Sequence, residues 1–152
     1  MSIFSGMNIS ATALTAQRTR MDVIAKNIAN AQTTRTKNGQ PYKRQVTVFK
    51  EVDGKDDFPS YLYGGRTQKN KDKRKQKGGV EVVGIVEDNS PFKLKYEPGH
   101  PDADENGYVK MSNVEMINEM VDMISSQRSY EANVTAINTS KAILQRALEI
   151  SK

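Results

Sequence analysis

The sequence predicts a mainly α-helical protein with a small β element, in which a long helix at each end of the chain pairs with the other as an antiparallel coiled coil. Both ends carry apolar residues at a seven-residue period, which places them on one face of a helix. The middle lacks this period and holds short β-branched runs between glycines and prolines. We therefore expect paired terminal helices over 1–34 and 111–152, and a small β-rich hairpin region with flexible loops over 35–110.

Composition limits the size of the core and the class of function. The chain has 152 residues, which fits one domain by length, and its 36% hydrophobic content and mean hydropathy of −0.68 are low for a compact globule. The net charge of +5 is local, because the run 66–77 holds seven basic residues and one acidic residue. We expect much of the apolar surface to lie in helix seams, some of it buried only against other subunits.

The first helix is predicted over residues 5–31. Its seam residues recur every seven positions: Met7, Leu14, Met21 and Ile28. Gln17 is a polar member of a flanking row, a kind of site that can specify the register of two helices.

The middle region is predicted to contain three strands, over 42–52, 80–86 and 92–96. The first alternates in part, with three valines on one side and Phe49 on the other. The turn signal Asn89-Ser90-Pro91 separates the second strand from the third, so we expect these two to form a hairpin.

The second helix is predicted to begin at a capping box formed by Ser112 and Glu115 and to run to about Ile150 without a glycine or a proline. Gln127 and Lys141 interrupt its apolar pattern, so we expect helices from other subunits to complete the seam. The predicted seam comprises Met116, Met123, Tyr130, Ile137 and Leu144, with an interleaved row of Met120, Val134 and Leu148.

The sequence contains no motif that predicts a catalytic site, a cofactor site or a binding site for a small-molecule substrate. The run 102–107 matches the first half of a calcium loop, but Lys110 and Asn113 occupy its ninth and twelfth positions, so we expect an acidic turn that binds no calcium. His100 is the only histidine and the chain has no cysteine, which removes the partners of a catalytic triad or a zinc site. We expect a protein that is not an enzyme and holds no cofactor or metal.

The basic run 66–77 leaves one alternative open, a protein that binds nucleic acid through this loop. The run contains no aromatic residue to stack on bases, so we favour a solvated loop and expect no nucleic-acid partner. No stretch is long and apolar enough for a membrane span, and the N-terminal residues lack the pattern of a cleaved signal peptide.

Three segments resemble the bacterial flagellar basal-body rod proteins, and among them the proximal rod subunits. The first runs from Ser10-Ala11 through Asn27-Ile28-Ala29-Asn30-Ala31 and includes Thr33-Thr34-Arg35. The others are PGHPDADENGYV at 98–109 and RSYEANVTAINTSKAIL at 128–144. Together they cover both terminal thirds of the chain.

The resemblance implies a structural subunit of a drive shaft that crosses the periplasm and transmits torque from the motor to the hook. The terminal helices would form the inner layer of a helical tube, with the middle region outside. The implied partners are other rod subunits, further copies of this chain, the adaptor between the rod and the export gate, and the flagellar export machinery, which would export the chain without a cleaved signal. A different axial protein, such as another rod subunit or a hook subunit, is the alternative.

The resemblance also draws attention to three asparagines, Asn27, Asn30 and Asn133. They are either ordinary polar residues on a helix face or hydrogen-bond partners of neighbouring helices where water is scarce.

Overall fold

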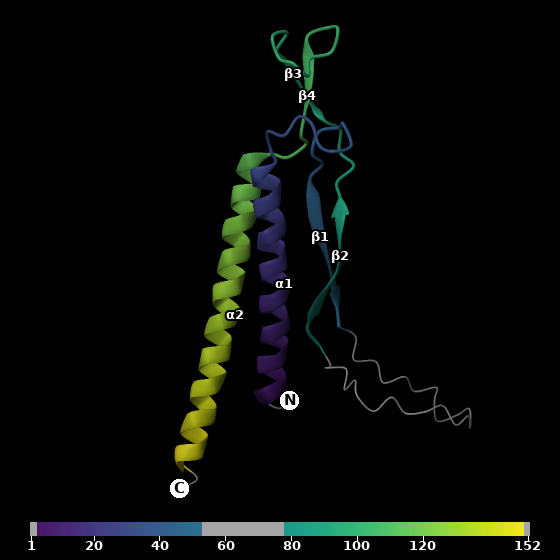
Figure 1. Cartoon of the computed structure of the whole chain (residues 1–152). Helices are drawn as coiled ribbons and strands as arrows, with labels where there is room; N and C mark the ends of the chain where they lie inside the picture. The colour runs from purple at the N-terminus through teal and green to yellow at the C-terminus, as the bar shows by residue number, and fades with distance from the viewer. Residues whose placement is uncertain (1–2, 53–77, 151–152) are drawn as a thin grey trace, which may run out of the picture.

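The structure, a computed structural model, describes residues 3–52 and 78–150. It is mainly helical, with two long helices and a small β region of two hairpins (Figure 1). The basic run 66–77 lies outside the described residues, so the expected loop there stays a prediction. In chain order the elements are α1 (Ile3–Ala29), β1 (Gln45–Glu51), β2 (Val80–Glu87), β3 (Lys93–Tyr96), β4 (Tyr108–Met111) and α2 (Met116–Ile150).

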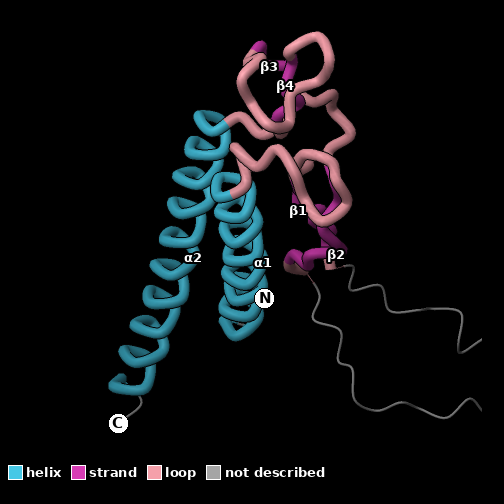
Figure 2. Tube along the Cα trace, turned by 45° about the horizontal axis from the view of Figure 1, so that its top comes forward, coloured by secondary structure: helices cyan, strands magenta, loops and turns pink. Residues whose placement is uncertain are grey.

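The two helices lie side by side and run in opposite directions, with α1 between α2 and the β1–β2 hairpin (Figure 1). The hairpin contacts α1, and the loops gather with β3 and β4 at the head of the helix pair (Figure 2). Because α2 has 35 residues and α1 has 27, the C-terminal turns of α2 extend beyond the start of α1.

Contact on two sides explains which residues of α1 are most buried. The four buried positions are Ala16, Val23, Ile24 and Asn27. The predicted seam residues Met7, Leu14, Met21 and Ile28 are half-buried instead. A helix packed against α2 on one side and a hairpin on another needs a wider apolar face than a strict heptad provides.

The buried face of α2 differs from the predicted one at the two ends of the helix and in the interleaved row. Met123, Tyr130, Val134, Ile137 and Leu144 are half-buried, as a seam requires, but Met116, Met120 and Leu148 are exposed. The seven-residue row that is buried or half-buried beside the seam is polar: Glu119, Ser126, Asn133 and Ser140. The small serines in this row suit close packing of two backbones.

The predicted hairpin between 80–86 and 92–96 is wrong. Instead β1 pairs antiparallel with β2, and β3 pairs antiparallel with β4, a four-residue strand that the sequence pattern did not reveal. The segment between β2 and β3 does not form a tight turn, because Asn113 binds the backbone carbonyl oxygens of Asp88 and Ser90 and draws that segment toward the start of α2.

The β1–β2 hairpin reaches α1 through a close approach at Gly79. The Thr12 hydroxyl accepts a hydrogen bond from the backbone N–H of Val80 at 3.2 Å. Gly79 lies at φ +121°, and a Cβ added there would lie 2.7 Å from the Thr12 hydroxyl oxygen. Farther along the hairpin, Val83 has no partner in the register and forms a β-bulge in β2.

The start of α2 also differs from the prediction. The helix begins at Met116, and its first backbone hydrogen bond runs from the N–H of Glu119 to the carbonyl oxygen of Glu115. Ser112 is buried and its hydroxyl accepts from the N–H of Val114, so it forms a turn before the helix rather than a capping box.

Candidate functional site

A cluster of polar side chains joins the two helices to the β1–β2 hairpin where α1 ends and α2 begins. We call it the polar junction; it comprises Asn27, Tyr42, Arg44, Asn113 and Glu119. Its two most deeply buried members are Glu119, which is 0% exposed, and Asn27, which is 1% exposed. Buried polar groups stabilise a structure only when each of them finds a hydrogen-bond partner.

Asn27 uses every hydrogen-bonding position of its amide. Its nitrogen donates to the Gln45 carbonyl oxygen at 2.8 Å and to Glu119 Oε2 at 2.9 Å. Its oxygen accepts from the Gln45 N–H at 2.9 Å and from the Tyr42 hydroxyl at 3.0 Å. One side chain of α1 therefore pairs with the backbone of β1 in the manner of a neighbouring strand and also binds α2.

Glu119 holds the other half of the junction. Its Oε1 accepts from Arg44 Nε at 2.6 Å, so both carboxylate oxygens have charged or polar donors. Arg44 is the residue just before β1, and Glu119 lies in the first turn of α2. A buried carboxylate with directional partners fixes the geometry of the elements that carry them, because an unpaired buried charge is costly.

Two further carboxylates surround Arg44. Asp122 Oδ2 lies 3.4 Å from Arg44 Nη2, and Asp88 Oδ2 lies 3.6 Å from Arg44 Nη1. Arg20 Nη2 of α1 contacts the other oxygen of Asp122 at 3.3 Å. Arg44 is thus placed between α2 and the end of β2, and Asp122 connects it to α1.

Asn113 ties the segment before α2 to the residue before β1 and to the segment after β2. Its oxygen accepts from the backbone N–H of Arg44 at 2.7 Å, and its nitrogen donates to the carbonyl oxygens of Asp88 and Ser90 at 3.1 and 3.3 Å. The junction therefore fixes segments that are as much as 92 residues apart in sequence.

Burial, charge and hydrogen bonds in the polar junction and beside it shift three pKa values. Burial raises the pKa of the Tyr42 phenol, and the negative charges of Glu119 and Glu87 raise it further. Burial opposes the charge of Arg44, but the hydrogen bond and the charge of Glu119 outweigh it and leave the guanidinium pKa raised. The hydrogen bonds from Ser90 lower the pKa of the Asp88 carboxyl.

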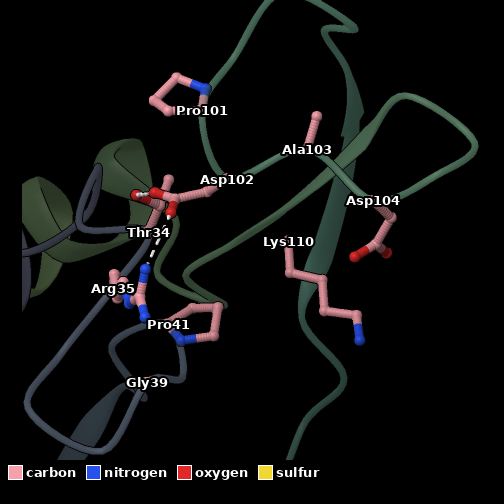
Figure 3. Close-up of a pocket in the computed structure, with 9 residues that line it drawn as sticks. All are labelled: Thr34, Arg35, Gly39, Pro41, Pro101, Asp102, Ala103, Asp104 and Lys110. Carbon is pink, nitrogen blue, oxygen red and sulfur yellow. Dashed lines mark hydrogen bonds and ion pairs between the residues drawn. The ribbon is translucent and has the colours of Figure 1, made fainter.

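A hollow of about 340 Å³ lies between the segment after α1 and the β3–β4 hairpin loop (Figure 3). Asp102, on one wall, accepts from the Thr34 hydroxyl at 2.9 Å and lies 3.8 Å from Arg35 Nη1. The Asp102 carboxylate therefore holds the hairpin loop against the segment that follows α1. Across residues 3–52 and 78–150, no group of three or more His, Cys, Asp or Glu is placed to hold a metal ion.

The start of α2 exposes apolar side chains on the face turned away from α1. We call this the outer stripe; it comprises Ile117, Met120, Val121 and Ile124, all exposed. Their spacing places them along one helix face, while Tyr130 and Ile137 lie on the other. Beyond Ile124 the outer face becomes polar. An exposed apolar stripe on the outer face of a helix whose other face is already packed is typical of an element covered by further protein.

The structure places the three singled-out asparagines differently. Asn27 bridges α1, α2 and β1. Asn30, in the turn after α1, donates to the carbonyl oxygen of Lys26, and Asn133 donates to that of Ser129 within α2. Sequence reasoning missed Glu119 and Arg44 altogether. One signal was present: Glu119 lies seven residues before Ser126 and fourteen before Asn133, in a polar heptad row beside the apolar one.

Neither helix in the described part of the chain is long and apolar enough to cross a membrane.

Comparison with known proteins gives consistent matches at both ends of the chain and over its whole length. Residues 7–37 match the family model described as "Flagella basal body rod protein", and residues 105–150 match "Flagellar basal body rod FlgEFG protein C-terminal". The "Flagellar basal-body rod protein FlgC" of Borreliella burgdorferi is 48% identical over 99% of this chain and 98% of its own. Proteins of the same name from Bacillus subtilis and Salmonella typhimurium are 46% and 39% identical, each over 100% of both chains.

Proposed function

Since the chain belongs to the FlgC family of flagellar basal-body rod proteins, we propose that it acts in the rod as a stiff subunit whose shape is set by the polar junction. The chain is a structural protein rather than an enzyme, as its family is. A subunit that carries torque has to resist rotation of its outer part relative to its helices. The polar junction is the observation that carries the proposal.

The junction suits this task because its contacts are directional. Apolar packing alone tolerates sliding of one element past another, whereas the Asn27 amide and the Arg44–Glu119 pair accept only a narrow range of geometries. The bonds from Asn27 reach both β1 and α2, so a rotation of the hairpin about α1 would break several of them together.

The outer stripe supports a second part of the proposal, namely that neighbouring subunits cover α2. In a helical tube each subunit presents two different surfaces, since open stacking requires heterologous contacts. The half-buried seam residues from Met123 to Leu144 would pair α1 and α2 as an antiparallel coiled coil, and the stripe would face the next subunit.

Assembly in cells tests the role of the stripe. Ile124→Asp places a charge in the stripe, whereas Thr135→Asp places the same charge on the same helix face beyond it, and both residues are exposed in the single chain. In a strain that lacks the native protein, we expect Ile124→Asp to be expressed but absent from isolated basal bodies. Thr135→Asp should be incorporated. Incorporation of both variants to the same extent would contradict the stripe's role.

The family also motivates finer proposals about location and partners. The chain would be exported by the flagellar machinery without a cleaved signal, would lie in the periplasmic part of the rod, and would contact the adaptor between the rod and the export gate. Intact mass spectrometry of the protein from purified basal bodies tests the export proposal. We expect the mass of the full chain, with or without its first Met, and a mass that lacks a longer N-terminal segment would contradict it.

A further inference from the structure

The only histidine of the chain, His100, fixes the backbone of the loop that joins β3 to β4. Its Nδ1 accepts a hydrogen bond from the backbone N–H of Asp102 at 3.1 Å, and its carbonyl oxygen accepts from the N–H of Ala103 at 3.0 Å. The two bonds close a turn in which Pro101 follows the histidine. Asn and Asp side chains bind the N–H two residues on in turns of this kind, so the imidazole here takes the part of an amide or carboxylate oxygen.

Asp102 is also the residue through which this loop is attached to the rest of the molecule (Figure 3). Within residues 3–52 and 78–150, the polar contacts between the loop and the segment after α1 both end on its carboxylate, at the Thr34 hydroxyl and at Arg35 Nη1. The Arg35 side chain is 73% exposed, and an ion pair in water contributes little. The attachment is therefore weak and depends on the direction that the turn at His100 gives to Asp102.

The hydrogen bond within the turn requires a neutral imidazole. A neutral ring carries its proton on one nitrogen and accepts at the other, whereas a protonated ring donates from both. Protonation of His100 would therefore set two N–H groups against each other, one at Nδ1 and one at the backbone of Asp102. Histidine is the side chain that ordinarily changes its charge between about pH 5 and pH 8.

The charged groups around this turn favour the response to acid. They come from the loop itself, from β3 and β4, and from the segment after α1: Glu97, Asp102, Asp104, Lys95, Lys110 and Arg35. A hydrogen bond from Lys95 lowers the pKa of the Glu97 carboxyl most, and the charge of His100 adds to this effect. Glu97 thus offers a protonated imidazole a favourable interaction, whereas Arg35 and Lys110 line the hollow with Asp102.

We propose that His100 is a pH-sensitive latch that holds the β3–β4 loop against the segment after α1 when its ring is neutral and releases the loop when its ring is protonated. Because the attached loop binds the neutral ring, release takes up a proton, and acid therefore favours the released loop. The hollow between the loop and the segment would then widen. The latch is a property of the single chain and does not depend on the proposed role in the rod.

Nuclear magnetic resonance of the full-length chain tests the latch. The resonances of the His100 ring and of the backbone amides of Asp102, Thr34 and Arg35 are followed from pH 8 to pH 5. We expect the three amides to shift with the same midpoint as the ring. Carboxylates titrate near pH 4, so their contribution falls outside most of this range.

Two substitutions separate the steps of the latch. His100→Asn keeps an acceptor for the Asp102 N–H but does not titrate, so the amides of Thr34 and Arg35 should stay at their pH 8 positions throughout. Asp102→Ala keeps the N–H and removes the carboxylate. The ring and the amide of residue 102 should still titrate together in this variant, whereas the amides of Thr34 and Arg35 should no longer follow them.

Electron spin resonance tests whether the loop moves. Spin labels are attached at Glu105→Cys in the loop and Lys37→Cys beyond the segment after α1, both at exposed positions. We expect a narrow distance distribution at pH 8, a broader one at pH 5, and a narrow one at both pH values when His100→Asn is added. Circular dichroism checks that the helices persist at pH 5. An unchanged distribution at pH 5, or equal broadening in His100→Asn, would overturn the proposal. Neither result bears on incorporation of the chain into basal bodies, so the latch and the proposed function are tested separately.

Discussion

Asn27 and Glu119 are the residues on which the arrangement of α1, α2 and the β1–β2 hairpin depends most. Both are polar, both are buried, and each binds partners on another element. Their cost of burial is offset only because the whole set of donors and acceptors is matched. Loss of one member therefore affects the others.

Replacing Glu119 with glutamine tests this dependence. Glu119→Gln keeps the size of the side chain but removes its charge, and it sets an amide N–H against either Arg44 or the Asn27 nitrogen, both of which are donors. Removing one partner of a buried pair leads us to expect a loss of about 3 kcal/mol in the free energy of unfolding. Urea unfolding followed by circular dichroism measures it.

The exposed Glu131 gives the matched control for that experiment. Glu131→Gln makes the same chemical change on α2, where the carboxylate contacts only Gln127 among the described side chains. We expect a change within about 0.5 kcal/mol. Equal effects of the two substitutions would show that the burial of Glu119 carries no special weight.

Tyr42 gives the junction a dependence on alkaline pH. Because the phenol pKa is raised above its ordinary value of 10.0 in the folded chain, folding favours the protonated form. Its contribution is complete below pH 10 and is lost as the pH rises through the folded-state pKa. We expect the stability difference between the unmodified chain and Tyr42→Phe to shrink from pH 9 to pH 11 in urea titrations. A difference that stays constant over this range would contradict the assignment.

At the scale of elements, the approach of β2 to α1 depends on a glycine. Gly79→Ala would adopt φ +121° with a Cβ 2.7 Å from the Thr12 hydroxyl oxygen. Backbone strain and the clash together lead us to expect a loss of about 2 kcal/mol in the free energy of unfolding. Thermal unfolding measures this loss as a lower midpoint temperature.

Gly84 serves as the control in the same strand, because it does not have a positive φ and a Cβ added there would meet nothing within 4 Å. Gly84→Ala should leave the midpoint unchanged or slightly raised. A similar loss at both glycines would indicate a general intolerance of β2 rather than a specific contact with α1.

The elements show where sequence reasoning succeeded and where it failed. Seven-residue spacing predicted both helices, because a long apolar period is a local property of the chain. Strand pairing failed, because Asn113 and Asp88 decide the path between β2 and β3 through contacts between distant residues. The polar row containing Glu119 and Ser126 was missed for the same reason: a heptad of polar residues resembles a solvated face until its partners on α1 and before β1 are known.

At the scale of the whole molecule, the protection of backbone amides from hydrogen exchange should decrease with distance from the polar junction. Asn27 and the first turns of α2 are held by buried contacts, whereas the last turns of α2 lie beyond α1 and are exposed. We expect amide hydrogen exchange in the dilute monomer to be slow in residues 20–28 and 117–127 and fast in 143–150. Assembly into the rod should slow exchange at the C-terminal tip. Uniform protection along α2 in the monomer would contradict this gradient.

The central claim is that the polar junction holds the β1–β2 hairpin at a fixed orientation relative to the helices. The chain has no cysteine, so spin labels can be attached at two introduced cysteines, Lys50→Cys on β1 and Ser125→Cys on α2, both at exposed positions. Pulsed electron spin resonance then gives the distribution of distances between the hairpin and α2.

We predict one narrow distance distribution in the otherwise unmodified chain and in Glu131→Gln. In Glu119→Gln the distribution should broaden markedly under conditions where circular dichroism shows both helices intact. A distribution that is already broad with the junction complete, or that stays equally narrow in Glu119→Gln, would contradict the account.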